Sequence, residues 1–205
     1  KKVPILEDDE TNPTNTYGET KLTMEKMMKW VNKANGIKFV SLRYFNVAGA
    51  LEDGSIGEDH SPETHLIPLI LQVPLKKREH ITVFGDDYPT EDGTCIRDYI
   101  HVLDLADAHI KALNYLRAGN ESNIFNLGNG KGFSVKEMID ATKEATGEEI
   151  KVVLGERRAG DPAILIASSE KAHNLLKWEP KYTNVKDIIK TAWTWHSKNP
   201  DGFND

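Results

Sequence analysis

Cysteine and long apolar runs are what this sequence has least of. Its single cysteine, Cys95, excludes an intramolecular disulfide framework, so a reducing cytoplasm is the simplest compartment. No cysteine and histidine cluster has the spacing of a structural zinc site, and we expect no metal. No apolar run approaches the length that spans a bilayer, and residues 1–10 turn acidic too soon for a signal peptide, so we expect no membrane segment.

Positive charge is also in short supply. The chain has 26 lysine and arginine residues against 32 aspartate and glutamate residues, which gives a net charge of -6. General binding of nucleic acid needs a broad basic surface, so we expect no nucleic-acid partner, although local arginines can hold one small anionic ligand. With 205 residues, of which 39% are hydrophobic, the chain can bury a proper core in one large domain or two small ones.

A tyrosine and a lysine stand four residues apart near the start of the first expected helix. That spacing places Tyr17 and Lys21 on one face of a helix, one turn apart. An ammonium beside a phenol favours the phenolate, so Tyr17 is a candidate base. The same spacing also arises by chance in many helices, where an aromatic ring leans on an aliphatic stem.

The pattern from Thr16 to about Asn35 predicts a helix that stops at Gly36. Its apolar positions predict a face for packing in the core or at a subunit interface, namely Met24, Met27, Met28 and Val31. A short buried strand is expected over 37–44, and a helix that feeds a strand favours α/β wiring. The loop 52–64 then holds glycines, a proline and several carboxylates, and loops at strand ends often bind ligands.

The rest of the chain alternates in the same way. A helix is expected over 65–78, with Pro74 ending or kinking it, and residues 97–102 lead into a helix that stops at Gly119. The glycines of 128–132 lack the spacing of a phosphate-binding loop, so this is a plain turn. Further helices are expected from the capping box of Ser134 and Glu137, from Ser168 or Ser169, and after Thr183; strands are expected over 81–85, 124–128, 150–154 and 164–167. The inward face of the helix after residue 102 is expected to hold Leu105, Ala108, Ala112, Leu113 and Leu116.

Several segments, taken in order, resemble one family. They are Tyr-x-x-x-Lys at 17–21, Leu-Arg-Tyr-Phe-Asn at 42–46, the run Asp-Tyr-Pro-Thr-Glu-Asp-Gly-Thr-Cys-Ile-Arg-Asp-Tyr-Ile-His-Val at 87–102, Asn-Leu-Gly at 126–128 and Arg-Arg-Ala-Gly-Asp-Pro at 157–162. Together they resemble the extended short-chain dehydrogenase/reductases and, within them, the group that epimerises UDP-hexoses at C4. The resemblance to this subfamily rests mainly on the long run at 87–102, because the Tyr-x-x-x-Lys helix is shared by many dehydrogenases.

The resemblance implies an α/β fold, in which the C-terminal part of a Rossmann-type parallel sheet with flanking helices is joined to a smaller α/β substrate-binding domain. Residues 1–48 and 98–128 would belong to the dinucleotide-binding domain. Residues 49–97 and 129–205 would form the nucleotide-sugar domain.

The implied activity is an NAD-dependent isomerase reaction of galactose metabolism that interconverts UDP-galactose and UDP-glucose. Tyr17 would take the proton from the sugar 4-hydroxyl while NAD takes the C4 hydride, and the 4-keto sugar would turn over and receive the hydride on its other face. Lys21 would lower the pKa of Tyr17 and hold the nicotinamide ribose. Tyr17, Lys21 and Tyr44 would contact the cofactor.

The resemblance also implies a set of substrate contacts. Arg97 and Arg158 would hold the diphosphate, which guanidinium geometry suits, Asp161 the uridine ribose, and residues 82–84 the uracil edge. The whole implied set is Asn46, His65, Leu66, Thr82, Phe84, Arg97, Tyr99, Arg158, Asp161 and Leu165.

Two positions depart from the family pattern, and two histidines stand outside it. His65 stands where many members have asparagine. Leu165 stands where a tyrosine, cysteine or serine tunes sugar size, which leaves N-acetylated sugars open. We expect His101 and His109 to be structural or surface residues.

The family's glycine-rich turn, its acidic ribose contact and its catalytic serine or threonine precede the Tyr-x-x-x-Lys helix, and this sequence does not contain them. We therefore expect the chain alone to hold NAD poorly, to be inactive, and to associate through exposed sheet and apolar surface, with a homodimer as the expected state. Two alternatives stay open. One is another nucleotide-sugar enzyme of the family, a dehydratase or decarboxylase, and the other is a non-catalytic nucleotide-sugar-binding module.

Overall fold

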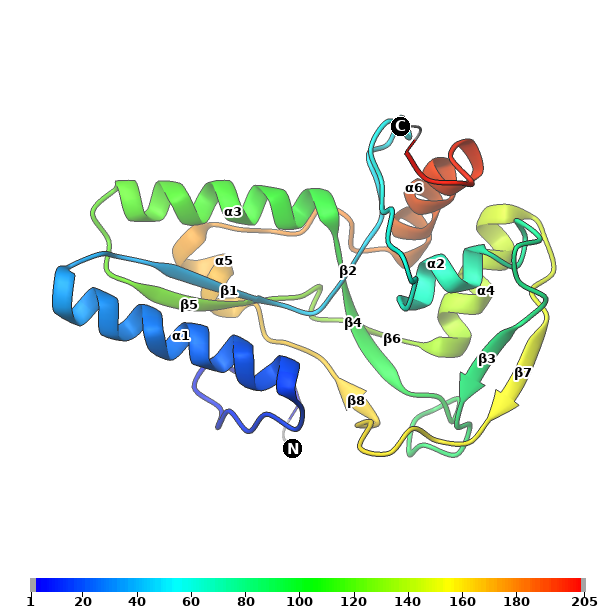
Figure 1. Ribbon diagram of the computed structural model, residues 1–205, viewed down its shortest axis with the longest axis horizontal. Helices are drawn as coiled ribbons and strands as arrows, with labels where there is room; N and C mark the ends of the chain where they lie inside the picture. The colour runs from blue at the N-terminus through cyan, green and yellow to red at the C-terminus, as the bar shows by residue number, and fades with distance from the viewer. Residues whose placement is uncertain (1–2, 204–205) are drawn as a thin grey trace.

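The structure is a computed structural model that describes residues 3–203. Two groups of elements lie on either side of a central sheet (Figure 1). Within residues 3–203, no helix combines the length and the apolar character that crossing a membrane would take.

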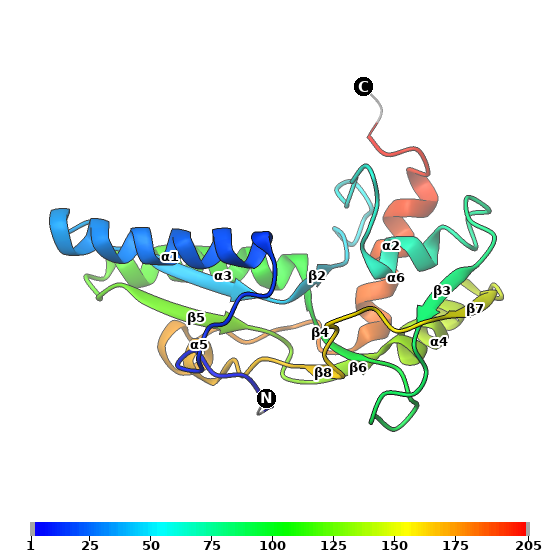
Figure 2. The ribbon, with the colours of Figure 1, turned by 60° about the horizontal axis from the view of Figure 1, so that its bottom comes forward.

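The first group is built on a pair of parallel strands, β1 (Val40–Tyr44) and β5 (Asn123–Leu127), in the register Val40 to Asn123. The strands lie between α1 (Thr16–Asn35) and α5 (Glu170–Leu176), as Figure 2 shows, and α3 (Val102–Arg117) completes the group. Phe125, Leu127 and Trp178 are at most 1% exposed in its core.

The central sheet is organised around β4 (Ile96–His101). On one side β4 pairs in parallel with β2 (Asn46–Ala48). On the other side it pairs with the antiparallel β6 (Gly132–Ser134). The parallel β8 (Ile164–Leu165) pairs with Ile96 and Arg97, as β6 does, and therefore lies on the edge of β4 opposite to β6. Because β4 continues directly into α3, it joins the two groups physically.

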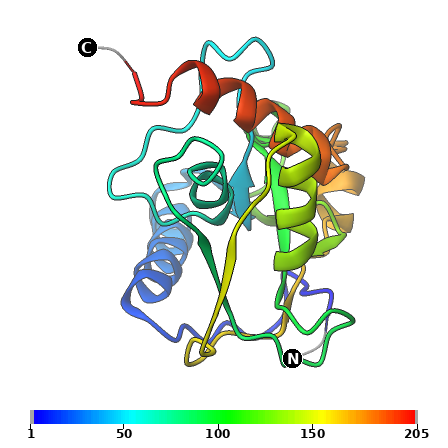
Figure 3. The ribbon, with the colours of Figure 1, turned by 90° about the vertical axis from the view of Figure 1, so that its right-hand side faces the viewer.

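The second group holds the larger core. Parallel strands β3 (Ile81–Phe84) and β7 (Val152–Gly155) lie beside α2 (Leu66–Leu71), α4 (Val135–Thr146) and α6 (Val185–Lys198). Figure 3 shows α4 and α6 packed side by side. Their fully buried side chains include Met138, Ile188 and Ile189, which meet Ile70 and Leu71 of α2.

The α/β character and the parallel pairing expected from the sequence are confirmed. Gly36, expected to stop α1, takes the left-handed conformation at its end, with a φ of 69°, and the side chain of Asn15 accepts a hydrogen bond from the Gly18 N–H at its start. Ser169 is the N-cap of α5 but makes no side-chain capping bond. Both bonds of the capping box between Ser134 and Glu137 are present.

The prediction that the apolar face of α1 packs in the core is wrong. Met24 and Met27 are 55% and 61% exposed, whereas the buried residue of this helix is Glu25. The Glu25 carboxylate receives two hydrogen bonds of 2.7 Å from Arg43 of β1 and one from Ser41. This bidentate pair turns the charged side of the helix onto the strand and the methionine side outward.

Other boundaries also differ from the sequence prediction. The helix expected over 65–78 is only α2, because the chain leaves the helix in the turn before Pro74, and Lys76 has a φ of 60°. Residues 96–101 form a strand. Leu113, expected inward on α3, is 49% exposed, and Asp104, Ala108 and Ala112 are buried there instead.

The segment α5 lies in the core of the first group, although the sequence boundaries assign 129–205 to the nucleotide-sugar domain. Ala172 and Leu176 pack there with Trp178, whose indole N–H donates to the carbonyl oxygen of Asp104. The chain therefore returns to the first group before it forms α6.

His101 locks the end of β4 to α6 and is fully buried. Its Nδ1 accepts a hydrogen bond from the Leu103 N–H at the start of α3, so the ring proton is on Nε2, which lies 2.9 Å from the hydroxyl oxygen of Thr191. Tyr182 stacks on the ring at 3.8 Å, and a Cβ at Gly49 would lie only 2.4 Å from it. The ring fits as a neutral, structural group, as expected from the sequence.

We predict a pH dependence from this histidine. Burial lowers the pKa of His101 below its ordinary 6.5, so the unfolded chain takes up the proton first. The contribution of the neutral ring to stability is complete above pH 6.5 and is lost as the pH falls toward the lower folded pKa, by at most about 1.4 kcal/mol per pH unit. Urea unfolding of wild type and His101→Asn at pH 7.5 and 5.5 measures it. The stability gap between the two should shrink at pH 5.5, and an equal gap at both values contradicts the assignment.

Candidate functional site

A cavity of about 390 Å³ lies where β2 and β4 of the central sheet meet the second group. Its wall comes from the start of α2, from β3, and from the loop after β7. The predicted substrate residues that line it are Asn46, His65, Leu66, Thr82, Phe84, Arg97, Tyr99, Arg158 and Asp161. Segments far apart in the sequence thus bring nearly the whole predicted set to one cavity.

Arg97 is the most enclosed cation of the cavity, with a side chain 14% exposed. Its Nη1 donates to the carbonyl oxygens of Ile96 and Pro162, at 2.9 and 2.8 Å. Its Nη2 lies 3.1 Å from the Asp161 carboxylate but is buried without a hydrogen-bond partner in the described part of the chain. A buried donor left unpaired is costly, so a ligand oxygen at this nitrogen would be favoured.

Two more arginines line the cavity, and the loops on which they stand are exposed. The guanidinium of Arg158 lies 4.0 Å from the centroid of the Phe84 ring, a cation–π contact that places the charge over the end of β3. Arg78, which reaches Gln72 with its Nε, stands at another wall. Against these three cations the wall holds one carboxylate, that of Asp161, so the cavity suits an anion.

Three further polar side chains line the cavity on β2 and next to or within β4, namely Asn46, Cys95 and Tyr99. The side-chain amide of Asn46 donates to the carbonyl oxygen of Asp98 on the neighbouring strand, at 3.0 Å, which holds it at the cavity wall. Tyr99 is 4% exposed, and burial raises its pKa far above the ordinary value of 10. Burial also raises the pKa of the Cys95 thiol, against the lowering effect of Arg97. Burial therefore favours the neutral form of both groups.

Four predicted residues lie outside this cavity. Leu165 pairs with Arg97 in the sheet but does not line the cavity. Tyr17 is 71% exposed at the start of α1, where the Lys21 ammonium lies 5.0 Å from its ring centroid. Tyr44 is 49% exposed at the carboxyl end of β1. Tyr17 and Lys21 thus lie beside each other, and neither lines the arginine-lined cavity.

Sequence reasoning missed some residues of the wall, chiefly Arg78, Thr64 and Cys95. The sequence predicts Arg78 as the last residue of a helix over 65–78, but the chain leaves the helix after Leu71 and Arg78 lines the cavity. The clustering of Arg78 with Lys76 and Lys77 signals a local positive charge, yet it cannot show which way each side chain points.

These features define an α/β protein with a cavity lined by three arginines and one carboxylate. The model of the family described as "NAD dependent epimerase/dehydratase family" matches residues 1–128. The chain therefore belongs to the NAD-dependent epimerase/dehydratase family.

Individual relatives agree with this. The UDP-glucose 4-epimerase of Lacticaseibacillus casei is 60% identical over 205 residues, which are 100% of this chain and 62% of that protein. A crystal structure of a UDP-glucose 4-epimerase with 60% identity superposes with a TM-score of 0.96 and covers 98% of this chain and 61% of that chain. The Bifidobacterium longum UDP-glucose 4-epimerase, solved in complex with NAD+ and UDP, is 39% identical with a TM-score of 0.92, over 99% of this chain and 61% of that chain. The chain thus spans about three fifths of the length of these relatives.

Proposed function

We propose that the arginine-lined cavity binds the UDP part of a UDP-hexose, and that the protein to which this chain belongs is a UDP-glucose 4-epimerase. The carrying observation is that every predicted substrate residue except Leu165 lines one cavity with three arginines. The Bifidobacterium longum relative with bound NAD+ and UDP supports the same ligand class.

The diphosphate would lie between Arg97 and Arg158. The Nη2 of Arg97 is ion-paired with Asp161 but makes no hydrogen bond within the described residues, and Arg158 comes from a different loop, so the two guanidinium groups can approach a diphosphate from two sides. Charge-assisted hydrogen bonds from guanidinium to phosphate are short and strong.

The uracil would lie along β3. Within residues 3–203, β3 pairs with β7 alone, and Thr82 and Phe84 line the cavity. The backbone groups of an unpaired strand edge match the alternating donors and acceptors of a uracil ring, as they would match another strand. Asp161 would accept from the ribose, and Asn46 would contact the sugar-diphosphate.

Proton transfer is assigned to Tyr17. A phenolate formed beside the Lys21 ammonium would accept the proton of the sugar 4-hydroxyl. Tyr17, Lys21 and Tyr44 are exposed, and Tyr44 stands at the carboxyl end of a parallel strand, where cofactors bind in such folds, so these three residues fit a dinucleotide. When bound, NAD supplies the acceptor and donor of hydride at C4.

We also propose that the protein is cytoplasmic and that its partner is a second copy of the same chain. The exposed methionine side of α1 forms a hollow of about 290 Å³ lined only by apolar side chains, namely Met24, Met27, Met28, Val31, Ile37 and Phe39. Contiguous apolar surface of this kind is typical of an interface between protein chains.

Calorimetry with UDP tests the cavity on this chain directly. We expect saturable binding that Arg158→Ala weakens about 10- to 100-fold, because a charged hydrogen bond to phosphate is lost. Arg117→Ala, at the exposed end of α3, is the matched control and should leave the affinity unchanged. Absence of binding to wild type, or equal weakening by both variants, would refute the assignment.

The catalytic role is tested on a protein that carries this chain together with the remaining length of its relatives. With UDP-galactose as substrate, Tyr17→Phe should lower C4 inversion by at least about 100-fold, because the proton acceptor is gone. The affinity for UDP should stay the same, since Tyr17 lies outside the cavity. Tyr115→Phe serves as the control for loss of a phenol. Full activity of Tyr17→Phe, or release of a dehydrated or decarboxylated sugar by wild type, speaks against an epimerase of this mechanism.

A further inference from the structure

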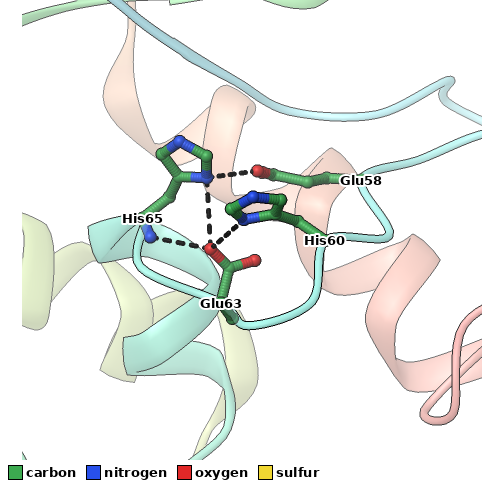
Figure 4. A group of neighbouring side chains, drawn as sticks. All are labelled: Glu58, His60, Glu63 and His65. Carbon is green, nitrogen blue, oxygen red and sulfur yellow. Dashed lines mark hydrogen bonds and ion pairs between the residues drawn. The ribbon is translucent and has the colours of Figure 1, made fainter. Parts of the chain in front are cut away.

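Four potential metal ligands converge in the loop that leads into α2. Glu58, His60, Glu63 and His65 each offer one ligand atom, and these atoms all lie within 4.8 Å of one another. Figure 4 shows the two carboxylates and the two imidazoles turned toward a common centre. All four come from one stretch of eight residues with the pattern Glu-x-His-x-x-Glu-x-His.

The distances match a small coordination sphere. His65 Nδ1 lies 2.6 Å from Glu58 Oε1 and 3.1 Å from Glu63 Oε1, and His60 Nδ1 lies 3.4 Å from the same Glu63 oxygen. Ligands of zinc stand about 2.0–2.2 Å from the ion, so neighbouring ligand atoms in a tetrahedron are about 3.4 Å apart. Because all four ligand atoms lie within 4.8 Å of one another, side-chain movements of about an ångström would bring them to this spacing around one ion.

The two carboxylates converge on the same imidazole. His65 Nδ1 faces one oxygen of Glu58 and one oxygen of Glu63, and it has at most one proton to share between them. Glu63 Oε1 in addition accepts the backbone N–H groups of Thr64 and His65, at 2.6 and 2.7 Å. These two bonds hold the oxygen in the cluster, as outer-shell bonds hold a ligand in metal sites.

The charge of the cluster also calls for a cation. In the described part of the chain, the ion pairs of Glu58 and Glu63 go only to the two histidines. One divalent ion would balance both negative charges.

We propose that Glu58, His60, Glu63 and His65 bind one divalent transition-metal ion, with Zn²⁺ as the best match. Two imidazole ligands favour zinc over magnesium or calcium, which prefer oxygen ligands. His60 and His65 are about half exposed, so the ion can enter from solvent.

The position gives the ion a structural role at the cavity. His65 precedes the first residue of α2 and lines the arginine-lined cavity, whereas Glu58, His60 and Glu63 line a neighbouring hollow on the other side. A bound ion would fix the loop that forms this wall. That role rests on the proposed function, whereas binding of zinc does not.

Zinc binding is tested on the chain itself after removal of metals with EDTA. Titration with ZnCl2 in a calorimeter should give one saturable site per chain. His60→Asn and Glu63→Gln should each weaken it by at least about tenfold. His173→Asn is the matched control, because His173 lies on α5, away from the cluster, and pairs with Glu179. The zinc affinity of this variant should equal that of wild type.

Far-UV circular dichroism and melting temperature separate lost ligands from lost folding. Wild type and His173→Asn should melt at higher temperature with zinc and return to the metal-free value with EDTA, whereas metal-free His60→Asn should show native dichroism and no zinc-dependent shift. The proposal is overturned by the absence of a saturable site in wild type, by unchanged affinity in both ligand variants, or by MgCl2 binding at these residues as tightly as ZnCl2. Each of these results is independent of whether UDP binds.

Discussion

A single buried carboxylate holds the molecule together where its parts meet. Asp98 lies in the middle of β4 and is fully buried, and its two oxygens accept the backbone N–H groups of Asn129 and Ala167, at 2.7 and 3.2 Å. Its carbonyl oxygen holds the amide of Asn46. Burial raises the pKa of Asp98, and the backbone hydrogen bonds oppose that rise. Three segments that are distant in the sequence are thereby fixed beside one strand.

The alternation of side chains along β4 links the buried Asp98 to the cavity. Residues next to each other in a strand point to opposite sides, so fixing Asp98 inward directs Arg97 to the cavity. His101 at the end of the same strand fixes α3 and α6 in the same way. β4 thus positions Arg97, which we propose to bind phosphate, and also connects the two groups of elements.

Much of this could be predicted from the sequence, because some signals are local. The end of α1 follows from Gly36, and the start of α4 follows from the capping box of Ser134 and Glu137, whose hydrogen bonds are local. The cavity residues came from the order of several motifs rather than from any one of them. The spacing of Tyr17 and Lys21 alone could not have distinguished a catalytic pair from a surface pair.

The rest depends on which partner each face meets. The apolar period of α1 is real, but the pair of Glu25 and Arg43 decides which side of the helix faces the strand, and no helical pattern contains that information. Arg78 reached the cavity because the helix ended before Pro74. The cluster of Glu58, His60, Glu63 and His65 carries none of the cysteine spacings of structural zinc sites, so only the folded loop brings it to notice.

The central claim is that the cavity beside β4 is the nucleotide site, and a crystal structure of this chain with UDP tests it most directly. The account predicts density for the diphosphate between Arg97 and Arg158, with an oxygen within hydrogen-bond distance of Arg97 Nη2, and density for the uracil along Thr82 to Phe84. UDP bound elsewhere with this cavity open, or bound with its uracil at the arginines and its phosphates in solvent, would contradict it.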